Sequence, residues 1–167
     1  LAATALTMLA GVPANIVRHT LKTFKGVEHR IETVRTVDGV TYINDSKGTN
    51  VDASVQAVRA MKAGTVLLAG GYDKHCDFLP FAKEIKDSKI HTVVVLGDTA
   101  DQIEKALREV GFESILRAGS FEEAVMLARS CAKPGENVLL SPACASFDMF
   151  SDYEQRGRVF KEIVGRL

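Results

Sequence analysis

The chain has 167 residues, of which 46% are hydrophobic, so it is long enough for one well-buried domain with a small appendage. Basic and acidic residues number 21 each, and this balance disfavours binding to nucleic acid or to an anionic membrane surface. No apolar run approaches the roughly 20 residues of a membrane span. Three scattered cysteines, Cys76, Cys131 and Cys144, suggest free thiols in a reducing cytosol.

The first 27 residues predict two short helices and a linker. Apolar and small residues suit a buried helix that ends at Gly11, and Pro13 opens a second helix that runs to about Phe24 with one apolar face. Residues 25–28 read as a linker, so we expect a domain boundary there. The start has neither an initiator methionine nor a charged leader segment, and we expect the chain to be part of a longer one.

The rest of the chain predicts a hairpin followed by repeated strand–loop–helix units. Asp38-Gly39 is a turn signal between a strand that ends at Val37 and one that begins at Val40. Further strands are expected at 65–69, 92–96, 114–116 and 137–140, with helices after each. The expected helix caps are Thr49 or Asn50, and capping boxes Thr99/Gln102, Ser120/Glu123 and Ser151/Glu154.

Apolar strands without alternation, each followed by a helix, predict a doubly wound, mostly parallel, Rossmann-like α/β sheet with helices on both faces and an N-terminal antiparallel hairpin strand. Ligands bind such sheets at the carboxyl ends of the strands, near the reversal of strand order. The three loops richest in polar groups begin after Ile43, Leu68 and Leu140, at carboxyl ends. We therefore expect these loops to line one cleft.

The predicted cleft is rich in donors for anionic oxygens, which favours a carboxylate substrate or a nucleotide phosphate. Its donors are Lys47, Lys74, the hydroxyls of Ser46, Thr49, Ser141 and Ser146, and Arg30 from the linker edge. No general base is evident, because Asp45 and Asp73 are explained equally well as ligand acceptors or lysine partners. Solvated surface lysines and an ordinary capped turn remain the structural alternatives.

Several motifs of other functional sites are absent or favour a structural role. Neither a P-loop nor G-x-G-x-x-G occurs. The adjacent residues His75, Cys76 and Asp77 favour a local turn over a metal site, and Cys144 favours a packed thiol over a nucleophile. Phe147 and Phe150 are expected in the core, or else in the cleft wall.

Four motifs in this order closely resemble the Mur ligases, and within them the branch that joins D-glutamate to UDP-N-acetylmuramoyl-L-alanine. The motifs are His29-Arg30-Ile31-Glu32, then Asp45-Ser46-Lys47-Gly48-Thr49-Asn50, then Gly70-Gly71-Tyr72-Asp73-Lys74 with Asp77-Phe78, and last Leu140 to Asp148 with Tyr153-Glu154-Gln155-Arg156-Gly157. The resemblance implies that residues 1–27 are the helical end of a central ATPase domain plus a linker. Residues 28–167 correspond to the C-terminal, amino-acid-binding domain.

The resemblance implies an ATP- and Mg²⁺-dependent amide ligase of peptidoglycan synthesis in the bacterial cytoplasm. In this family an acyl phosphate of UDP-muramoyl-alanine is attacked by the amine of D-glutamate. The matched D-glutamate residues are Thr49, Lys74, Ser146 and Phe147, with Tyr153 at the border. Lys47 corresponds to a position between that site and the reaction centre, so Lys47 and Lys74 are the expected catalytic residues. Arg30 and Asp45 correspond to contacts with the nucleotide phosphate and ribose.

The family's P-loop, magnesium ligands and UDP-sugar domain have no counterpart in this chain, so we expect no metal ligand and no activity in the chain alone. One alternative is a related ATP-dependent ligase of the folylpolyglutamate type, which shares the architecture and uses another amino acid. Another is a non-catalytic α/β binding module of the flavodoxin or response-regulator type. A response regulator needs clustered acidic residues at its first strand ends, whereas the loop around Lys47 is cationic.

Overall fold

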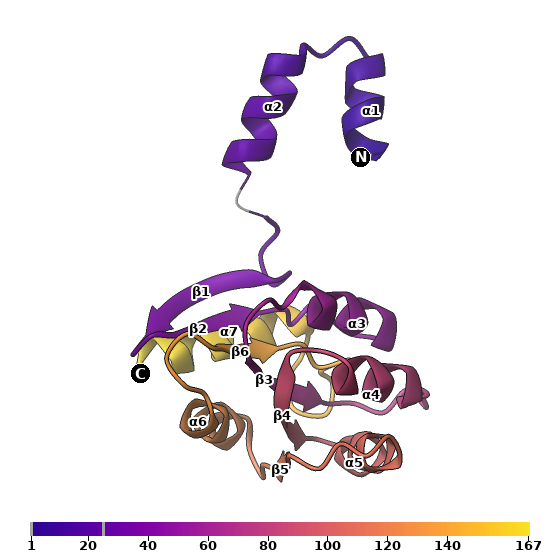
Figure 1. Ribbon diagram of the computed structural model, residues 1–167, viewed down its shortest axis with the longest axis vertical. Helices are drawn as coiled ribbons and strands as arrows, with labels where there is room; N and C mark the ends of the chain where they lie inside the picture. Colours follow the sequence, from indigo (N-terminus) through magenta and orange to yellow (C-terminus); the bar gives the residue numbers. More distant parts are fainter. Residues whose placement is uncertain (1, 25) are drawn as a thin grey trace.

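A six-stranded sheet forms the centre of the α/β domain (Figure 1) in the computed structural model, which describes residues 2–24 and 26–167. Leu1 and Lys25, which belong to the predicted first helix and linker, lie outside the described residues. The strand order is β1-β2-β6-β3-β4-β5, and β1 is antiparallel to β2 while the other neighbours are parallel. The strands are β1 (Glu32–Val37), β2 (Val40–Asn44), β3 (Thr65–Gly70), β4 (Ile90–Leu96), β5 (Ile115–Arg117) and β6 (Asn137–Leu140). The predicted fold class is confirmed.

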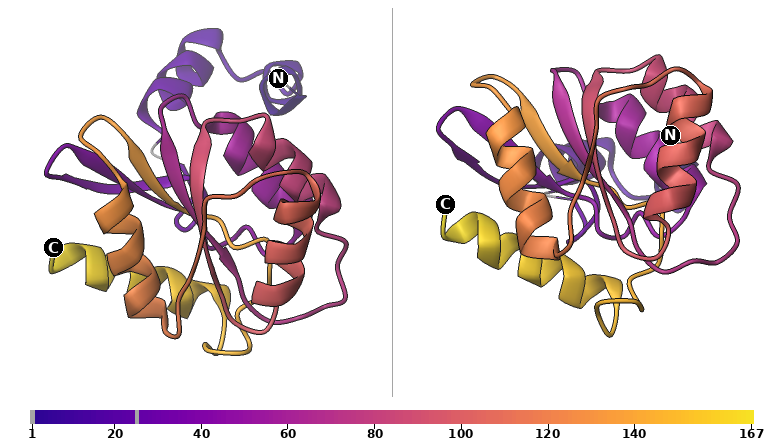
Figure 2. Two further views of the ribbon diagram at one scale, coloured as in Figure 1. Left: turned by 60° about the horizontal axis from the view of Figure 1, so that its bottom comes forward. Right: turned by 90° about the horizontal axis from the view of Figure 1, so that it is seen from below.

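Helices cover both faces of this sheet (Figure 2). One face carries α3 (Val51–Ala60), α4 (Leu79–Lys86) and α5 (Ala100–Glu109), and the other carries α6 (Phe121–Cys131) and α7 (Tyr153–Gly165). Because helices cover both faces, the side chains on both faces of each central strand pack against apolar residues. This explains why the strands lack the alternation of a half-exposed sheet.

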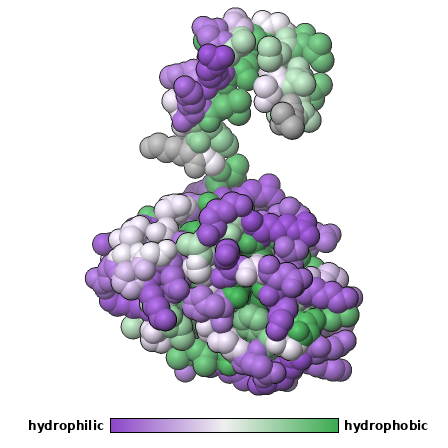
Figure 3. Space-filling view, in the orientation of Figure 1, coloured by the Kyte–Doolittle hydropathy of each residue, from purple (hydrophilic) through white to green (hydrophobic). Residues whose placement is uncertain are grey.

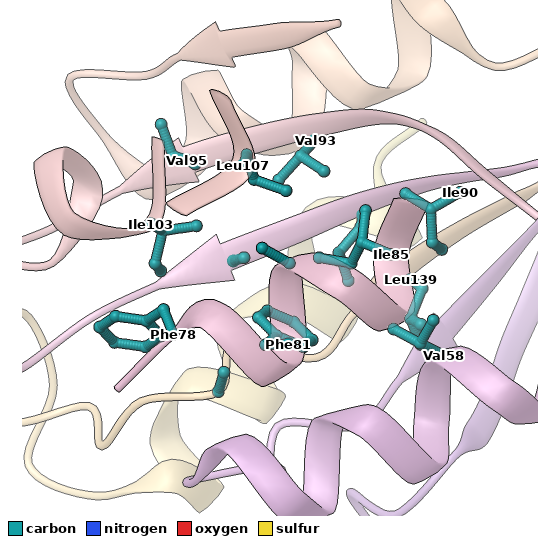
Figure 4. Packing of buried hydrophobic residues seen from close by; sticks show 14 of the residues in the cluster. Val58, Phe78, Phe81, Ile85, Ile90, Val93, Val95, Ile103, Leu107 and Leu139 are labelled. Atoms are coloured by element: carbon teal, nitrogen blue, oxygen red, sulfur yellow. The ribbon is translucent and has the colours of Figure 1, made fainter. Parts of the chain in front are cut away.

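The two cores take alternate residues of the same strands. Leu67, Val93 and Leu139 pack with Phe81 and its neighbours beneath α3, α4 and α5 (Figure 4). The intervening residues of the same strands join Phe160 beneath α6 and α7. Most residues of the four inner strands β2, β6, β3 and β4 are buried on one side or the other, so this part of the sheet is packed densely enough to hold its loops in place.

The hairpin at the sheet edge is confirmed. Asp38 and Gly39 both have positive φ, 51° and 81°, which is the conformation of a type I′ turn, and Val37 pairs with Val40. The turn returns the chain as β2, which then pairs with β6 in the interior of the sheet.

The first two helices, α1 (Ala2–Leu9) and α2 (Ala14–Thr23), stand away from the sheet as a separate pair (Figure 1). They contain no buried residue, and Leu9 is 85% exposed. Hydrophobic surface is visible on this pair in Figure 3. The expected burial of the first helix is therefore wrong for this structure, because α1 packs on α2 rather than on the sheet. Among the described helices, none is both long and apolar enough to cross a membrane.

Two of the predicted helix caps are present. Asn50, rather than Thr49, caps α3, since its side chain accepts a hydrogen bond from the backbone N of Ala53 at 2.9 Å. Ser120 caps α6 by accepting from the N of Glu123 at 3.2 Å. Both helices therefore start where local sequence predicts.

The other two predicted capping boxes are absent, although Thr99 does occupy the N-cap position of α5. Thr99 forms no side-chain cap on α5, because its hydroxyl is paired with the backbone of Gly71, to the carbonyl and to the N–H at 3.1 Å each. The cap of α7 is Asp152, which accepts from the N of Gln155 at 2.6 Å, and not Ser151. Asp152 directly precedes Tyr153, the first residue of α7, so its carboxylate and not the hydroxyl of Ser151 is at the N-cap position.

Candidate functional site

The three polar loops lie side by side, because they follow β2, β6 and β3, which are neighbours in the sheet. The last strand in the sequence, β6, lies between β2 and β3. They comprise residues 45–50, 71–78 and 141–152. Two backbone hydrogen bonds join the second loop region to the third, from the N of Gly70 to the O of Pro142 at 2.9 Å and from the N of Tyr72 to the O of Ala145 at 3.0 Å. The predicted convergence of these loops is confirmed.

The side chain of Asp45 links the first loop by hydrogen bonds to the third loop and to the segment before β1. Its carboxylate accepts from the hydroxyl of Ser141 at 2.7 Å and from the backbone N of Ile31 at 3.2 Å. Only 4% of the residue is exposed, and burial raises the pKa of Asp45, while these two hydrogen bonds offset part of the increase. The side chain thus holds the segment that carries Arg30 beside the loop that carries Lys47.

A pocket of about 300 Å³ lies between these segments and the start of α3. Its lining residues are Arg30, Ile31, Asp45, Lys47, Gly48, Ala53 and Gln56. The pocket combines two cations with one acidic acceptor, which suits phosphate oxygens together with a hydroxyl of a ribose. At Gly48 a Cβ would lie 2.7 Å from Oδ2 of Asp45, so the close packing of this loop requires glycine.

Lys47 is held on the aromatic ring of Tyr153. Its Nζ donates a hydrogen bond to the Tyr153 hydroxyl at 2.7 Å and lies 4.5 Å from the ring centroid. The phenol in turn donates to Glu154 at 3.2 Å. The structure therefore brings together two predicted site residues that lie 106 positions apart in the sequence.

The predicted amino-acid residues lie on all three loops. Thr49 is half-buried on the first loop, Lys74 is exposed on the second, and Ser146 is buried on the third at 2% exposure. Within the described part of the chain, no hydrogen bond joins Lys74 to another predicted site residue. The ammonium of Lys74 is thus directed by its loop alone.

Phe147 is 62% exposed and meets the ring of Tyr72 edge-on at 6.1 Å between centroids. Its predicted place in the core is wrong, because the third loop turns it outward toward the second loop. Phe150 behaves as predicted and packs edge-on against Phe121 in the core, with 5.0 Å between ring centroids.

Arg156 is a structural centre of the site that residue-by-residue reasoning missed. It is 2% exposed and donates four hydrogen bonds, two to Ser46 and one each to the carbonyls of Ala145 and Cys144, at 2.9–3.2 Å. Burial lowers the pKa of Arg156 to about 10, so it stays charged at neutral pH. Its signal in the sequence is a charge on the apolar face of a helix, four positions before Phe160.

Asp148 was also missed. Within the described residues, neither of its buried carboxylate oxygens has a hydrogen-bond partner of good geometry. Burial raises the pKa of Asp148, and the nearby backbone amides of Asp148 and Asp98 offset only part of the increase. A Cβ at Gly97 would collide with Oδ2, so this turn needs glycine. The carboxylate thus lies between the third loop and the start of α5.

The remaining titratable groups of the loops have local roles. The Sγ of Cys144 is paired with the hydroxyl of Thr99 at 3.2 Å, and burial raises its pKa to about 11, so it is a packed thiol as predicted. Asp73 accepts from the N of His75 at 2.6 Å and from Gln102 at 3.0 Å, which forms the local turn expected there. All three cysteines are free thiols.

The chain is similar to known ligases in sequence, and its fold is similar to those of solved structures. The family model described as Mur ligase, glutamate ligase domain, matches residues 29–144. A UDP-N-acetylmuramoylalanine--D-glutamate ligase of Thermoanaerobacter sp. (strain X514) is 50% identical over 169 residues, which is 100% of this chain and 37% of that protein. The ligase of the same name from Pelotomaculum thermopropionicum is 54% identical over 164 residues, covering 98% of this chain and 36% of that protein.

A solved structure of E. coli FolC in complex with ADP, without folate substrate, overlaps 93% of this chain and 36% of its own with a TM-score of 0.63. At 19% identity this similarity shows the fold alone. The chain spans about 37% of the length of the curated relatives it matches. The family model covers more than half of the chain and agrees with the motifs found in its sequence. The chain therefore belongs to the Mur ligase family.

Proposed function

We propose that this chain is part of an ATP-dependent ligase that joins D-glutamate to UDP-N-acetylmuramoyl-L-alanine in bacterial peptidoglycan synthesis, in the cytoplasm. The observation that carries the proposal is the meeting of the three polar loops at one edge of the sheet. Relatives that bear this name are 50% and 54% identical over nearly the whole chain.

The pocket beside Asp45 is assigned to the nucleotide. Arg30 and Lys47 offer cationic donors for phosphate oxygens, and the Asp45 carboxylate, which has lone pairs beyond those used by Ser141 and Ile31, offers an acceptor for the ribose. FolC, whose fold is similar, was solved with ADP. When bound, ATP supplies the phosphoryl group that activates the muramoyl-alanine carboxylate. We expect the Mg²⁺ ligands in a part of the protein outside this chain.

The other side of the loop cluster is assigned to D-glutamate, which carries two carboxylates. Lys74 provides a compact positive charge, and the hydroxyls of Thr49 and Ser146 provide neutral donors. Phe147 and Tyr153 form aromatic walls that exclude water from the amine. Lys47, between the two assigned sites, stabilises negative charge where the activated carboxylate meets the amine.

Residues 1–27 are proposed as the end of a central ATPase domain, and residues 28–167 as the amino-acid-binding domain. The exposed apolar side chains of α1 and α2, such as Leu9 and Leu21, are then interior residues of the central domain. We expect a hinge motion between the two proposed domains, which closes them and excludes water from the reacting groups. A chain without the central domain is expected to be inactive.

The first test uses the full-length protein that contains this chain and assays ATP-dependent joining of D-glutamate to UDP-N-acetylmuramoyl-L-alanine. Lys74→Ala and Ser146→Ala are expected to raise KM for D-glutamate, by about 10- to 100-fold for the lysine, because each removes a donor to a carboxylate. The KM for ATP should not change. Lys83→Ala, which removes an exposed lysine on α4, is the matched control and should behave as wild type.

The outcomes separate the candidate functions. If the protein joins another amino acid in place of D-glutamate, the proposed ligase activity stands and the proposed substrate is refuted. Addition of glutamate to a folate is the second activity to assay, because the fold is similar to that of FolC. A wild-type protein that joins neither would refute the proposed activity and leave a binding module. An unchanged KM for D-glutamate in both variants would refute the assignment of Lys74 and Ser146.

A further inference from the structure

Lys47 contacts Tyr153 through both the hydroxyl and the ring, whereas a wall of the binding site would need the ring alone. The Nζ of Lys47 both donates to the phenol oxygen at 2.7 Å and lies 4.5 Å from the ring centroid. The phenol's own proton is directed to Glu154 at 3.2 Å, so the phenol oxygen is the acceptor toward the lysine. An ammonium held by both a hydroxyl and a ring face has few alternative positions.

The backbones on both sides of this contact are fixed as well. The hydroxyl of Ser46 donates to the carbonyl of Tyr153 at 2.7 Å, and Arg156 donates to the same hydroxyl at 3.0 Å. On the other side, the N of Lys47 donates to the carbonyl of His29 at 3.0 Å, and the His29 ring meets that of Tyr153 edge-on at 6.2 Å. The first loop and the start of α7 are therefore held together by several contacts.

Lys47 also lines the pocket that contains Arg30 and Asp45. An ammonium has three N–H donors, and one of them is used by the phenol. The other two remain for an anionic oxygen in that pocket. A lysine without the phenol contact would lose this arrangement, because its four-carbon chain has many rotamers of similar energy.

We propose that the Tyr153 hydroxyl is a positioning group for Lys47 that raises the affinity of the pocket for the nucleotide phosphates. The inference rests on the proposed function, because it takes the pocket as the ATP site. It gives the Tyr153 hydroxyl a role on the nucleotide side, in addition to the proposed place of the ring at the border of the D-glutamate site.

The test is a double-mutant cycle in the full-length protein, read as the Kd of the non-hydrolysable ATP analogue adenylyl imidodiphosphate by titration calorimetry. Tyr153→Phe keeps the ring and removes the hydroxyl, and should weaken binding about three- to tenfold in the wild-type background. In a Lys47→Met background the same change should have no further effect, since the hydroxyl acts through the lysine. Tyr72→Phe is the matched control, because it removes a hydroxyl from an exposed tyrosine of the second loop.

Equal weakening by Tyr153→Phe in both backgrounds would overturn the inference, as would an unchanged Kd in Lys47→Met. A Tyr153→Phe variant that only raises KM for D-glutamate would assign the hydroxyl to the amino-acid site instead. These failures leave the proposed function intact as long as the wild-type protein joins D-glutamate. A wild-type protein that neither binds the analogue nor joins D-glutamate would refute the proposed function itself.

Discussion

Single buried charges shape the edge of the sheet where the three loops meet. Arg156 shows how such a charge is tolerated, because its guanidinium satisfies acceptors on two loops at once. A lysine at this position would offer one compact ammonium in place of the planar fork and could not reach all four acceptors. The loop geometry therefore depends on one side chain that contacts no proposed ligand.

Asp148 provides a pH-dependent prediction at the same scale. Its pKa in the folded chain is raised above the ordinary 3.8, so the folded state keeps a proton where the unfolded state has lost it. The free energy of unfolding should therefore fall as the pH rises from about 3.8 through the raised pKa. Asp148→Asn should be more stable than wild type at pH 7 and show a weaker dependence on pH, as measured by urea unfolding between pH 4 and 8.

The residual pH dependence of that variant is expected to come partly from Asp45, whose pKa is raised for the same reason. Asp87→Asn, at an exposed aspartate after α4, is the control and should leave the curve of the wild type unchanged. An Asp148→Asn variant that is less stable than wild type at pH 7 would contradict the idea that this carboxylate is a buried, poorly compensated charge.

At the scale of elements, α7 is the helix that positions the site. Its N-terminus carries Tyr153 and Arg156, and its second turn contacts the segment before β1. At Gly157 a Cβ would collide with the ring of His29, the residue before Arg30. A glycine inside a helix is thus required by a close approach between two elements.

Gly157→Ala is expected to destabilise the protein by about 1–3 kcal/mol, because overpacking outweighs the gain in helix propensity. It should also weaken nucleotide binding, since displacement of His29 moves Arg30 away from the pocket. Gly165→Ala, near the end of the same helix with open space around it, is the control and should be neutral or slightly stabilising. Chemical unfolding of both variants measures the difference, and equal stabilisation by both would contradict the close approach.

At the scale of the whole molecule, the chain consists of a complete α/β core and a helix pair that adds nothing to it. The sheet is covered on both faces by α3 to α7, whereas α1 and α2 bury no residue. Exposed apolar side chains on this pair, including Leu6 and Leu21, make it a surface that needs a partner rather than a source of stability.

Deleting residues 1–27 should therefore leave the free energy of unfolding of the remaining domain unchanged within about 0.5 kcal/mol. Urea unfolding of the full chain and of residues 28–167 measures this directly. Circular dichroism is the suitable signal, because the chain has no tryptophan whose fluorescence could report unfolding. A loss of more than about 1 kcal/mol would show that the helix pair supports the sheet domain after all.

The sequence by itself determined the fold class, the hairpin, the polar loops and two helix caps. These features depend on local rules, since hydrophobic patterning and turn residues such as Asp38-Gly39 act over a few positions. The motifs also predicted the family and nominated the site residues. Adjacent candidates for one cap were harder to distinguish, and Asp152 rather than Ser151 caps α7 because the helix begins one residue later than predicted.

Only the tertiary structure decided which distant groups meet. The hydroxyl of Thr99 does not cap α5, because it is hydrogen-bonded to Gly71, 28 positions away. Lys47 contacts Tyr153 across 106 positions. The tertiary structure also places Phe147 at the surface, and among the described residues it leaves the buried carboxylate oxygens of Asp148 without a hydrogen-bond partner. The Thr99 contact follows from the pairing of β3 with β4, and the Lys47 contact from the pairing of β2 with β6. Strand order is a property of the whole packed sheet that no local pattern encodes.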